Sequence, residues 1–206
     1  MSIIKSLVIA FSMYSKILMP HLELEEKDMK YVMGFFPLIG LITGALAYGW
    51  IYASRIFNVP DISRTLVLII LPVIITGGIH VDGYMDTCDA LNSYGDREKK
   101  LAILKDSHIG AFAVIKLLVY YVLYFAAAFI FVQKAGNMQV IIMSLIFYLS
   151  RIISGLAAVN FRGARNNGML HTFTSVTARK RVNIMLVMQL ILCISCMCIC
   201  LSLIHI

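Results

Sequence analysis

The chain has 206 residues, of which 60% are hydrophobic and only 14% are charged. This composition excludes an ordinary soluble domain, in which apolar residues make up about half of the chain and charged residues about a quarter. The formal net charge of +7 would also fit a protein that binds nucleic acid. Since the chain is so apolar, we expect a membrane protein and ask where its basic residues lie.

The first predicted element is a short helix over residues 3–19. Polar residues between Ser12 and Lys16 interrupt its apolar run, and no small-residue cleavage site follows, so a signal peptide is not indicated. We expect an interfacial or re-entrant helix that packs on the rest of the molecule. The acidic turn from His21 to Asp28 is expected to lie in water.

Five stretches are long and apolar enough to cross a hydrocarbon core of about 30 Å, which takes about 20 helical residues. These predicted spans cover residues 31–57, 63–79, 110–133, 138–161 and 182–206. Gly40 and Gly44 in the first span form a small-xxx-small pair, which permits close contact with another helix. The cysteines of the last span are expected to be small apolar helix residues, because their spacing suits neither disulfides nor zinc. Residues 1–206 are thus predicted to form a single all-α membrane domain, a polytopic helix bundle.

The basic residues lie mainly in loops, and their distribution predicts the orientation. With the N-terminus in the cytoplasm, the inside segments 1–30, 80–109 and 160–181 hold thirteen of the eighteen Lys and Arg residues. This excess follows the positive-inside rule. The positive charge is therefore attributed to topology in a lipid membrane, and no nucleic acid is expected as a partner.

The strongest candidate site is the acidic segment from His80 to Asp89, at the cytoplasmic end of the second span. Asp82, Asp86 and Asp89 have the spacing i, i+4, i+7, which on a helix places three carboxylates within an arc of about 60°. Three like charges near a membrane boundary need a counter-charge. Carboxylates without a His or Cys partner set favour Mg²⁺ or Mn²⁺, and Mg²⁺ commonly completes its shell with phosphates. The segment therefore predicts metal-dependent phosphate chemistry.

Three glycines around the cluster, Gly77, Gly78 and Gly83, would let a bulky ligand approach the main chain. If the helix includes His80, its side chain lies nearly opposite the aspartates. If Gly77 and Gly78 break the helix, His80 can turn inward as a general base or as a hydrogen-bond donor to phosphate. A structural role for His80 is the alternative. For the aspartates, the alternative is a solvated face paired with the basic residues of the same loop, Arg97, Lys99, Lys100 and Lys105.

The segment Lys105-Asp106-Ser107-His108 lies just before the third span. Asp106 or Ser107 could cap the helix that follows. In the functional interpretation the segment is a substrate loop, in which Lys105 and His108 supply positive charge to phosphates.

Two arginines are further candidates for substrate binding. Arg151 lies inside the fourth span, where ionisable residues usually face the interior of the bundle. A bound phosphate would be a partner for it, and a side chain that snorkels to the surface is the alternative. Arg165 follows in the next cytoplasmic loop, where a positive-inside anchor is the alternative to substrate binding.

Two segments resemble motifs of the cobalamin synthase family, the adenosylcobinamide-GDP ribazoletransferases. Residues 77–91 contain the pattern His-x-Asp-Gly-x-x-Asp-x-x-Asp, and residues 105–112 contain Lys-Asp-Ser-x-Ile-Gly. Weaker matches are Phe36-Pro-Leu-Ile-Gly40, Ser150-Arg151, and Ala164-Arg165 with Gly168. The order of the matches agrees throughout, so the resemblance covers most of the chain.

The resemblance implies the last assembly step of coenzyme B12, in which the hydroxyl of α-ribazole or of its 5′-phosphate attacks adenosylcobinamide-GDP and GMP leaves. It implies Mg²⁺ as the cofactor, the cytoplasmic (inner) membrane as the location, and an active site that faces the cytoplasm. Association with other corrinoid-pathway enzymes or with a second copy is a further expectation. The implied catalytic residues are His80, Asp82, Asp86 and Asp89, of which the three aspartates are the metal ligands. The implied substrate-binding residues are Lys105, Asp106, Ser107, His108, Arg151 and Arg165.

The sequence departs from the family pattern in three places. Lys16 and Leu18 stand where the family has an Arg and a Pro, and His108 stands where Arg is common. The family usually continues into further helices with a Gly-Gly-x-Thr-Gly-Asp segment, so we expect this chain to be short at its C-terminus.

Two other functions remain open from the residues. A CDP-alcohol phosphotransferase of lipid synthesis also gathers aspartates on membrane helices. Its usual Ala-Arg pair after the first Asp-Gly is replaced here by Tyr84-Met85, which disfavours that assignment. The non-enzymatic alternative is a transporter or scaffold whose aspartates bind a cation.

Overall fold

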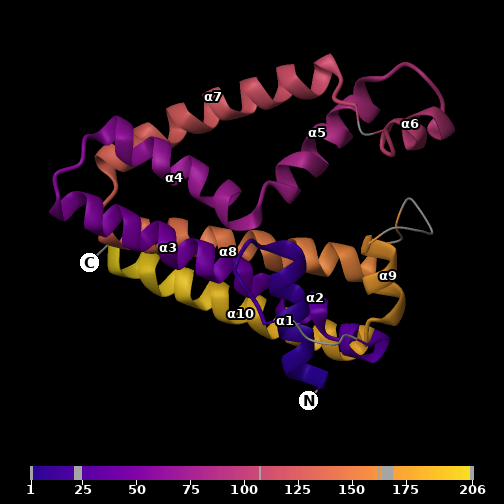
Figure 1. Ribbon diagram of the computed structural model, residues 1–206. Coiled ribbons are helices and arrows are strands. Elements are labelled where there is room, and N and C mark those ends of the chain that lie inside the picture. Colours follow the sequence, from indigo (N-terminus) through magenta and orange to yellow (C-terminus); the bar gives the residue numbers. More distant parts are fainter. Residues whose placement is uncertain (1, 21–24, 107, 162, 164–168, 205–206) are drawn as a thin grey trace. The chain divides into compact units, whose positions relative to one another are not determined.

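The computed structural model describes residues 2–20, 25–106, 108–161, 163 and 169–204, and every regular element among them is a helix (Figure 1). The predicted all-α class is therefore confirmed. Four helices in this part of the chain are long and apolar enough to cross a membrane, and a bent helix pair adds a fifth crossing if it is one span. These elements correspond to the five predicted spans.

The helices form two compact units, residues 1–57 with 135–206 and residues 58–134. The single membrane domain predicted over the whole chain stays a prediction. The first unit contains α1 (Ser2–Tyr14), η1 (Glu26–Met29), α2 (Val32–Phe35), α3 (Pro37–Ile56), α8 (Asn137–Asn160), α9 (Met169–Val176) and α10 (Arg179–Ile204). The second contains α4 (Asp61–Thr76), α5 (Ile79–Asn92), α6 (Arg97–Ile103) and α7 (Ala111–Lys134).

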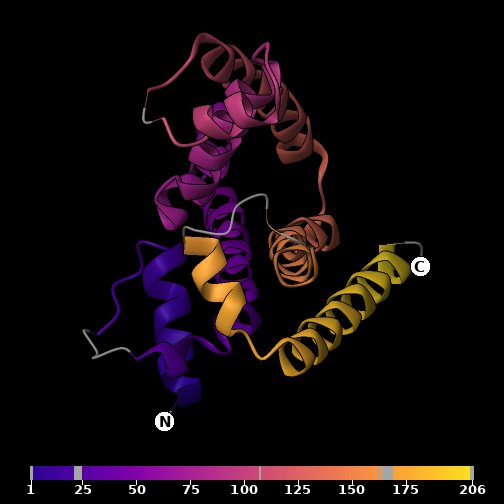
Figure 2. The same cartoon turned by 90° about the vertical axis from the view of Figure 1, so that its right-hand side faces the viewer.

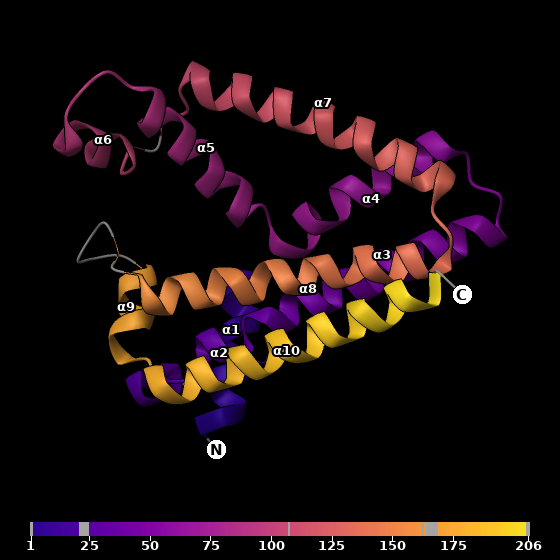
Figure 3. The same cartoon turned by 180° about the vertical axis from the view of Figure 1, so that it is seen from behind.

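The long helices α3, α8 and α10 run side by side in the first unit, and α8 contacts both of the others (Figures 1 and 3). Close approach of α3 and α8 depends on two glycines. A Cβ atom at Gly40 would overlap the main-chain carbonyl of Phe147, and one at Gly44 would overlap that of Ser144. The predicted packing role of the Gly40–Gly44 pair is therefore confirmed.

Polar side chains tie α10 to its neighbours within this apolar unit. Gln189 donates from Nε2 to the carbonyl of Gly34 over 2.9 Å and accepts from the Tyr148 hydroxyl over 3.0 Å. The nearby Cys193 is buried against Tyr148, and all four cysteines of α10 are free thiols, as expected for small apolar helix residues. Hydrogen bonds between membrane helices contribute about 0.6 kcal/mol each on average, so the network positions α10 more than it stabilises it.

The N-terminal helix α1 packs on η1 through a buried ion pair. Lys5 Nζ lies 3.4 Å from Asp28 Oδ2, and the Asp28 residue is only 1% exposed. The prediction that the acidic turn lies in water is therefore wrong for Asp28, because Lys5 of α1 neutralises its charge inside the unit. Residues 21–24 of that turn lie outside the described residues.

The short helix α9 packs against α1 in the first unit. Figure 2 shows α9, in light orange, turning sharply into α10, in yellow. Phe173 of α9 is buried with its ring centroid 6.1 Å from that of Tyr14 in α1. The turn itself is held by the Ala178 amide, which donates to the carbonyl of Lys30 over 3.1 Å.

In the second unit, α4 and α5 form a V, and the open ends of its two arms meet opposite ends of α7 (Figures 1 and 3). The bend between the arms is 92°. The acidic segment therefore lies on a helix of its own, α5, and not on a straight continuation of the second span.

Candidate active site

Two consecutive glycines produce the bend that separates α5 from α4. Gly77 has φ 65° and Gly78 has φ 81°, both in the left-handed region that other residues rarely adopt. The amide of Gly78 closes the end of α4 by donating to the carbonyl of Val73 over 3.1 Å. Of the two alternatives that the sequence left open, the structure has the break at these glycines, but α5 begins directly after them.

The three aspartates of the motif all lie on α5, as their spacing predicted. Asp82 is exposed, whereas Asp86 and Asp89 are half-buried. On a helix of this pitch the three side chains leave the axis within the same arc of about 60°. The described residues contain no group of three His, Cys, Asp or Glu side chains that already converge enough to hold a metal ion.

His80 lies on the other side of the same helix. Because α5 begins at Ile79, it includes His80. At 100° per residue His80 leaves the axis about 160° away from Asp82. Its ring is half-buried, with Nε2 shielded from solvent. The structure thus does not bring His80 onto the aspartate face.

Asp89 bonds to the first turn of α7. Its Oδ2 accepts a hydrogen bond from the Gly110 amide over 2.7 Å, and its Oδ1 accepts one from the Ala113 amide over 2.8 Å. These amides have no partner within their own helix, so a carboxylate there both completes their bonding and interacts favourably with the helix dipole. Asp89 therefore links the aspartate helix to the end of the loop before α7.

That loop contains the predicted substrate residues. Lys105 and Asp106 are exposed, and Asp106 Oδ1 accepts from the His108 amide over 3.0 Å and lies 2.5 Å from His108 Nδ1. The hydrogen bonds from the amide and ring of His108 lower the pKa of the Asp106 carboxyl. The suggestion that Asp106 caps the following helix is wrong, because Asp89 occupies that position. Ser107 lies outside the described residues.

The solvated-face alternative for the aspartates finds little support in the second unit. Within the described ranges, Asp82 and Asp89 form no ion pair with a lysine or an arginine. The basic residues of α6 and its neighbouring loops instead point into solvent, Lys100 being the one that is half-buried. Their charge is available to a ligand.

Arg151 lies in α8 of the first unit, and its guanidinium carbon is 5.9 Å from the centroid of the Phe36 ring. A guanidinium over an aromatic face is a favourable cation–π contact. In the described part of the chain Arg151 forms no ion pair with a carboxylate. Arg165 lies outside the described residues.

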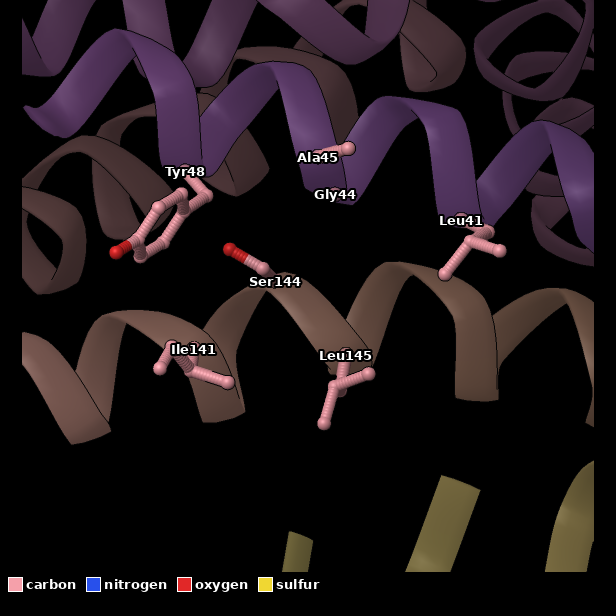
Figure 4. Close-up of a pocket in the computed structure, with 7 residues that line it drawn as sticks. All are labelled: Leu41, Gly44, Ala45, Tyr48, Ile141, Ser144 and Leu145. Carbon is pink, nitrogen blue, oxygen red and sulfur yellow. The ribbon is translucent and has the colours of Figure 1, made fainter. Parts of the chain in front are cut away.

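An apolar groove of about 370 Å³ lies between α3 and α8 (Figure 4). Its lining residues are Leu41, Gly44, Ala45, Tyr48, Ile141, Ser144 and Leu145. The Ser144 hydroxyl already donates to the carbonyl of Val140 over 2.8 Å. Since the lining offers no charged group to a phosphate, this groove is not the candidate site.

Two contacts at the candidate residues were not predicted from the sequence. The bond between Asp89 and Gly110 joins positions 21 residues apart, and no local pattern signals such a long-range cap. The contact between the Phe36 ring and Arg151 joins positions that are 115 residues apart. The sequence offers one signal for this contact. Phe36 directly precedes Pro37, the first residue of α3, so an aromatic side chain is expected at the start of that helix.

The sequence matches the cobalamin-5-phosphate synthase family over residues 6–206. It is 42% identical over 189 residues to an adenosylcobinamide-GDP ribazoletransferase of Lachnoclostridium phytofermentans, covering 92% of this chain and 71% of the relative. It is 38% identical to the protein of that name in Clostridium perfringens, covering 76% and 61%, and 30% identical to the one in Fusobacterium nucleatum, covering 82% and 63%. No solved structure matches this chain. The chain therefore belongs to the cobalamin-5-phosphate synthase family.

Proposed function

We propose that this chain transfers the phosphocobinamide group of adenosylcobinamide-GDP to α-ribazole or its 5′-phosphate and releases GMP. The family match and the relatives' printed names support a cobalamin-forming transferase. The observation that best supports the proposed active site is the link between α5 and the loop before α7, in which Asp89 accepts a hydrogen bond from Gly110. This link joins the end of the loop that contains Lys105 and His108 to the aspartate helix, which supports their assignment to one site.

The reaction exchanges the phosphoanhydride bond of the GDP group for a phosphoester bond. The acceptor hydroxyl oxygen forms a bond to the phosphorus attached to cobinamide, and the bond from that phosphorus to the GMP oxygen breaks. The hydroxyl proton leaves to water or to a nearby base, and GMP takes the electron pair of the broken bond. Lys105 and His108 are assigned to the phosphate oxygens, where positive charge stabilises the charge that develops.

The aspartates of α5 are the proposed holders of Mg²⁺. The donor set fits this ion, since Asp82 and Asp86 supply carboxylates one helical turn apart and Mg²⁺ is usually bound by one or two carboxylates plus phosphates. When bound, the ion would neutralise charge on the phosphoryl oxygens. Gly83 leaves the main chain beside Asp82 open, because no described atom beyond its neighbours and its own turn of helix lies within 4 Å of its Cβ position.

The proposed location is the cytoplasmic membrane, with α5 and the loop before α7 at its cytoplasmic side. The four or five spanning helices support a multi-pass protein. The excess of Lys and Arg in the segments on that side supports the orientation.

The test incubates membranes that contain this chain with adenosylcobinamide-GDP, α-ribazole and Mg²⁺ and measures GMP and the cobalamin product. Membranes with the relative from Lachnoclostridium phytofermentans are the positive control. We expect equal amounts of GMP and product, and neither when Mg²⁺ is removed. GMP from the relative but none from this chain would contradict the proposal, and release of CMP from a CDP-alcohol would favour the lipid-enzyme alternative.

A further inference from the structure

We propose that Asp89 is a positioning residue, which holds the first turn of α7 and the preceding residues 108–110 against α5, and that it is not a magnesium ligand. The proposal rests in part on the proposed function, because it divides the three aspartates of α5 into two candidate ligands and one helix cap.

The first observation that supports the proposal is the pair of hydrogen bonds accepted by Asp89. Both of its oxygens accept from main-chain amides at the start of α7, at 2.7 Å from Gly110 and 2.8 Å from Ala113. Acceptors at this position are the usual partners of the first amides of a helix. The carboxylate is thus oriented toward α7 by two bonds.

The second observation is the lack of a side chain at Gly110. A Cβ atom at this position would lie 2.6 Å from Oδ1 and 2.8 Å from Oδ2 of Asp89, far inside ordinary contact distance. The absence of a side chain at Gly110 is therefore what admits the carboxylate. Two positions far apart in sequence are fitted to each other, which a ligand role for Asp89 would not require.

Asp82 provides the contrast. It lies two turns before Asp89 on the same face of α5 and is exposed, and its carboxylate accepts no hydrogen bond from the described residues. Asp82 and Asp86 alone form the pair of carboxylates that Mg²⁺ usually takes with substrate phosphates. The third aspartate then sets where the loop before α7 lies relative to this pair.

Four variants separate the two roles. Asp89→Ala removes the cap, and Gly110→Ala displaces the carboxylate but leaves it in the chain. Asp82→Asn is the matched change at a candidate ligand. Asp96→Ala is the matched change at a helix cap away from the site, since Asp96 caps α6 by accepting from the Lys99 amide over 2.9 Å.

Two measurements on the purified full chain in detergent give the answer. Deuterium exchange follows the amides of residues 109–116, and electron paramagnetic resonance follows binding of Mn²⁺ as a probe for Mg²⁺. We expect Asp89→Ala and Gly110→Ala to speed exchange there about five- to tenfold, as loss of a helix cap predicts, with Mn²⁺ affinity unchanged. Asp82→Asn should weaken Mn²⁺ binding about tenfold or more without changing this exchange. Asp96→Ala should alter exchange in α6 alone.

The opposite results would overturn the inference. If Asp89→Ala weakens Mn²⁺ binding as much as Asp82→Asn does, Asp89 is a ligand. If exchange over residues 109–116 is unchanged in Asp89→Ala and Gly110→Ala, Asp89 does not hold α7. If the wild-type chain binds no Mn²⁺, the magnesium part of the proposed function fails, and the exchange result alone decides whether Asp89 positions α7.

Discussion

At Gly83, an effect on the proposed activity can be distinguished from an effect on the fold. It lies inside α5, where its Cβ position opens onto empty space next to Asp82. A glycine inside a helix costs about 1 kcal/mol relative to alanine, so nothing in the fold favours it there. A ligand that approaches the main chain closely would explain it.

We therefore predict that Gly83→Ala leaves the free energy of unfolding unchanged or raises it by up to about 1 kcal/mol. GMP release should fall about tenfold or more, because the added methyl group meets the incoming phosphate. Gly49→Ala in α3 is the matched control, since its Cβ position is equally open. It should keep full activity. Unchanged GMP release by Gly83→Ala would remove this residue from the site.

A pH prediction also belongs to single residues. Hydrogen bonds from the amide and ring of His108 lower the pKa of Asp106 below its ordinary value of 3.8. Ionised Asp106 therefore stabilises the native loop. This stabilisation is fully present above the ordinary pKa and is lost as the pH falls through the lowered pKa. Carbon-13 NMR of the Asp106 carboxyl, assigned with Asp106→Asn, should give a midpoint below 3.8. A midpoint at or above 3.8 would show that these bonds are absent in solution.

At the scale of elements, the contact between α3 and α8 rests on small residues that the sequence reveals. Gly40 and Gly44 recur four residues apart, a pattern local enough to be recognised without a structure. The same holds for the aspartates of α5, whose helical spacing is local. The Asp89 cap and the cation–π contact of Arg151 join distant positions, so they could be found only in the folded chain.

From the contact between α3 and α8 we predict that Gly44→Leu destabilises the first unit. The larger side chain must push α8 away, because even a Cβ atom would overlap the carbonyl of Ser144. Overpacking of this kind typically costs about 1–3 kcal/mol. Thermal unfolding in detergent should show a lower midpoint for Gly44→Leu and little change for Gly49→Leu, which lies on an open face of the same helix. Equal midpoints for the two variants would mean that the helices do not pack through Gly44.

At the scale of the whole molecule, the charge distribution predicts which loops face the cytoplasm. Four of the five spans could be predicted from hydropathy because each must cross about 30 Å of hydrocarbon, whereas the second predicted span is the bent pair of α4 and α5. The bend between α4 and α5 could be expected from Gly77 and Gly78, but its angle of 92° depends on packing against α7.

Topology can be measured with single cysteines and a membrane-impermeant maleimide, in a chain whose five native cysteines are replaced by alanine. Tyr94, in the loop after α5, is 92% exposed, and Phe57, directly after α3, is 77% exposed. We expect Phe57→Cys to be labelled in intact cells and Tyr94→Cys only after the membrane is opened. The reverse pattern would place the aspartate helix at the outer side and would contradict a cytoplasmic site.

The central claim of the account is that the aspartate face of α5 carries the transfer. Its most direct test compares GMP release by the wild-type chain, Asp82→Asn and Asp96→Asn, each in membranes with equal amounts of inserted protein and saturating Mg²⁺. We predict that Asp82→Asn lowers the rate about 100-fold or more, since a lost metal ligand removes several kcal/mol of transition-state stabilisation, and that Asp96→Asn stays near wild type. Full GMP release by Asp82→Asn would contradict the claim.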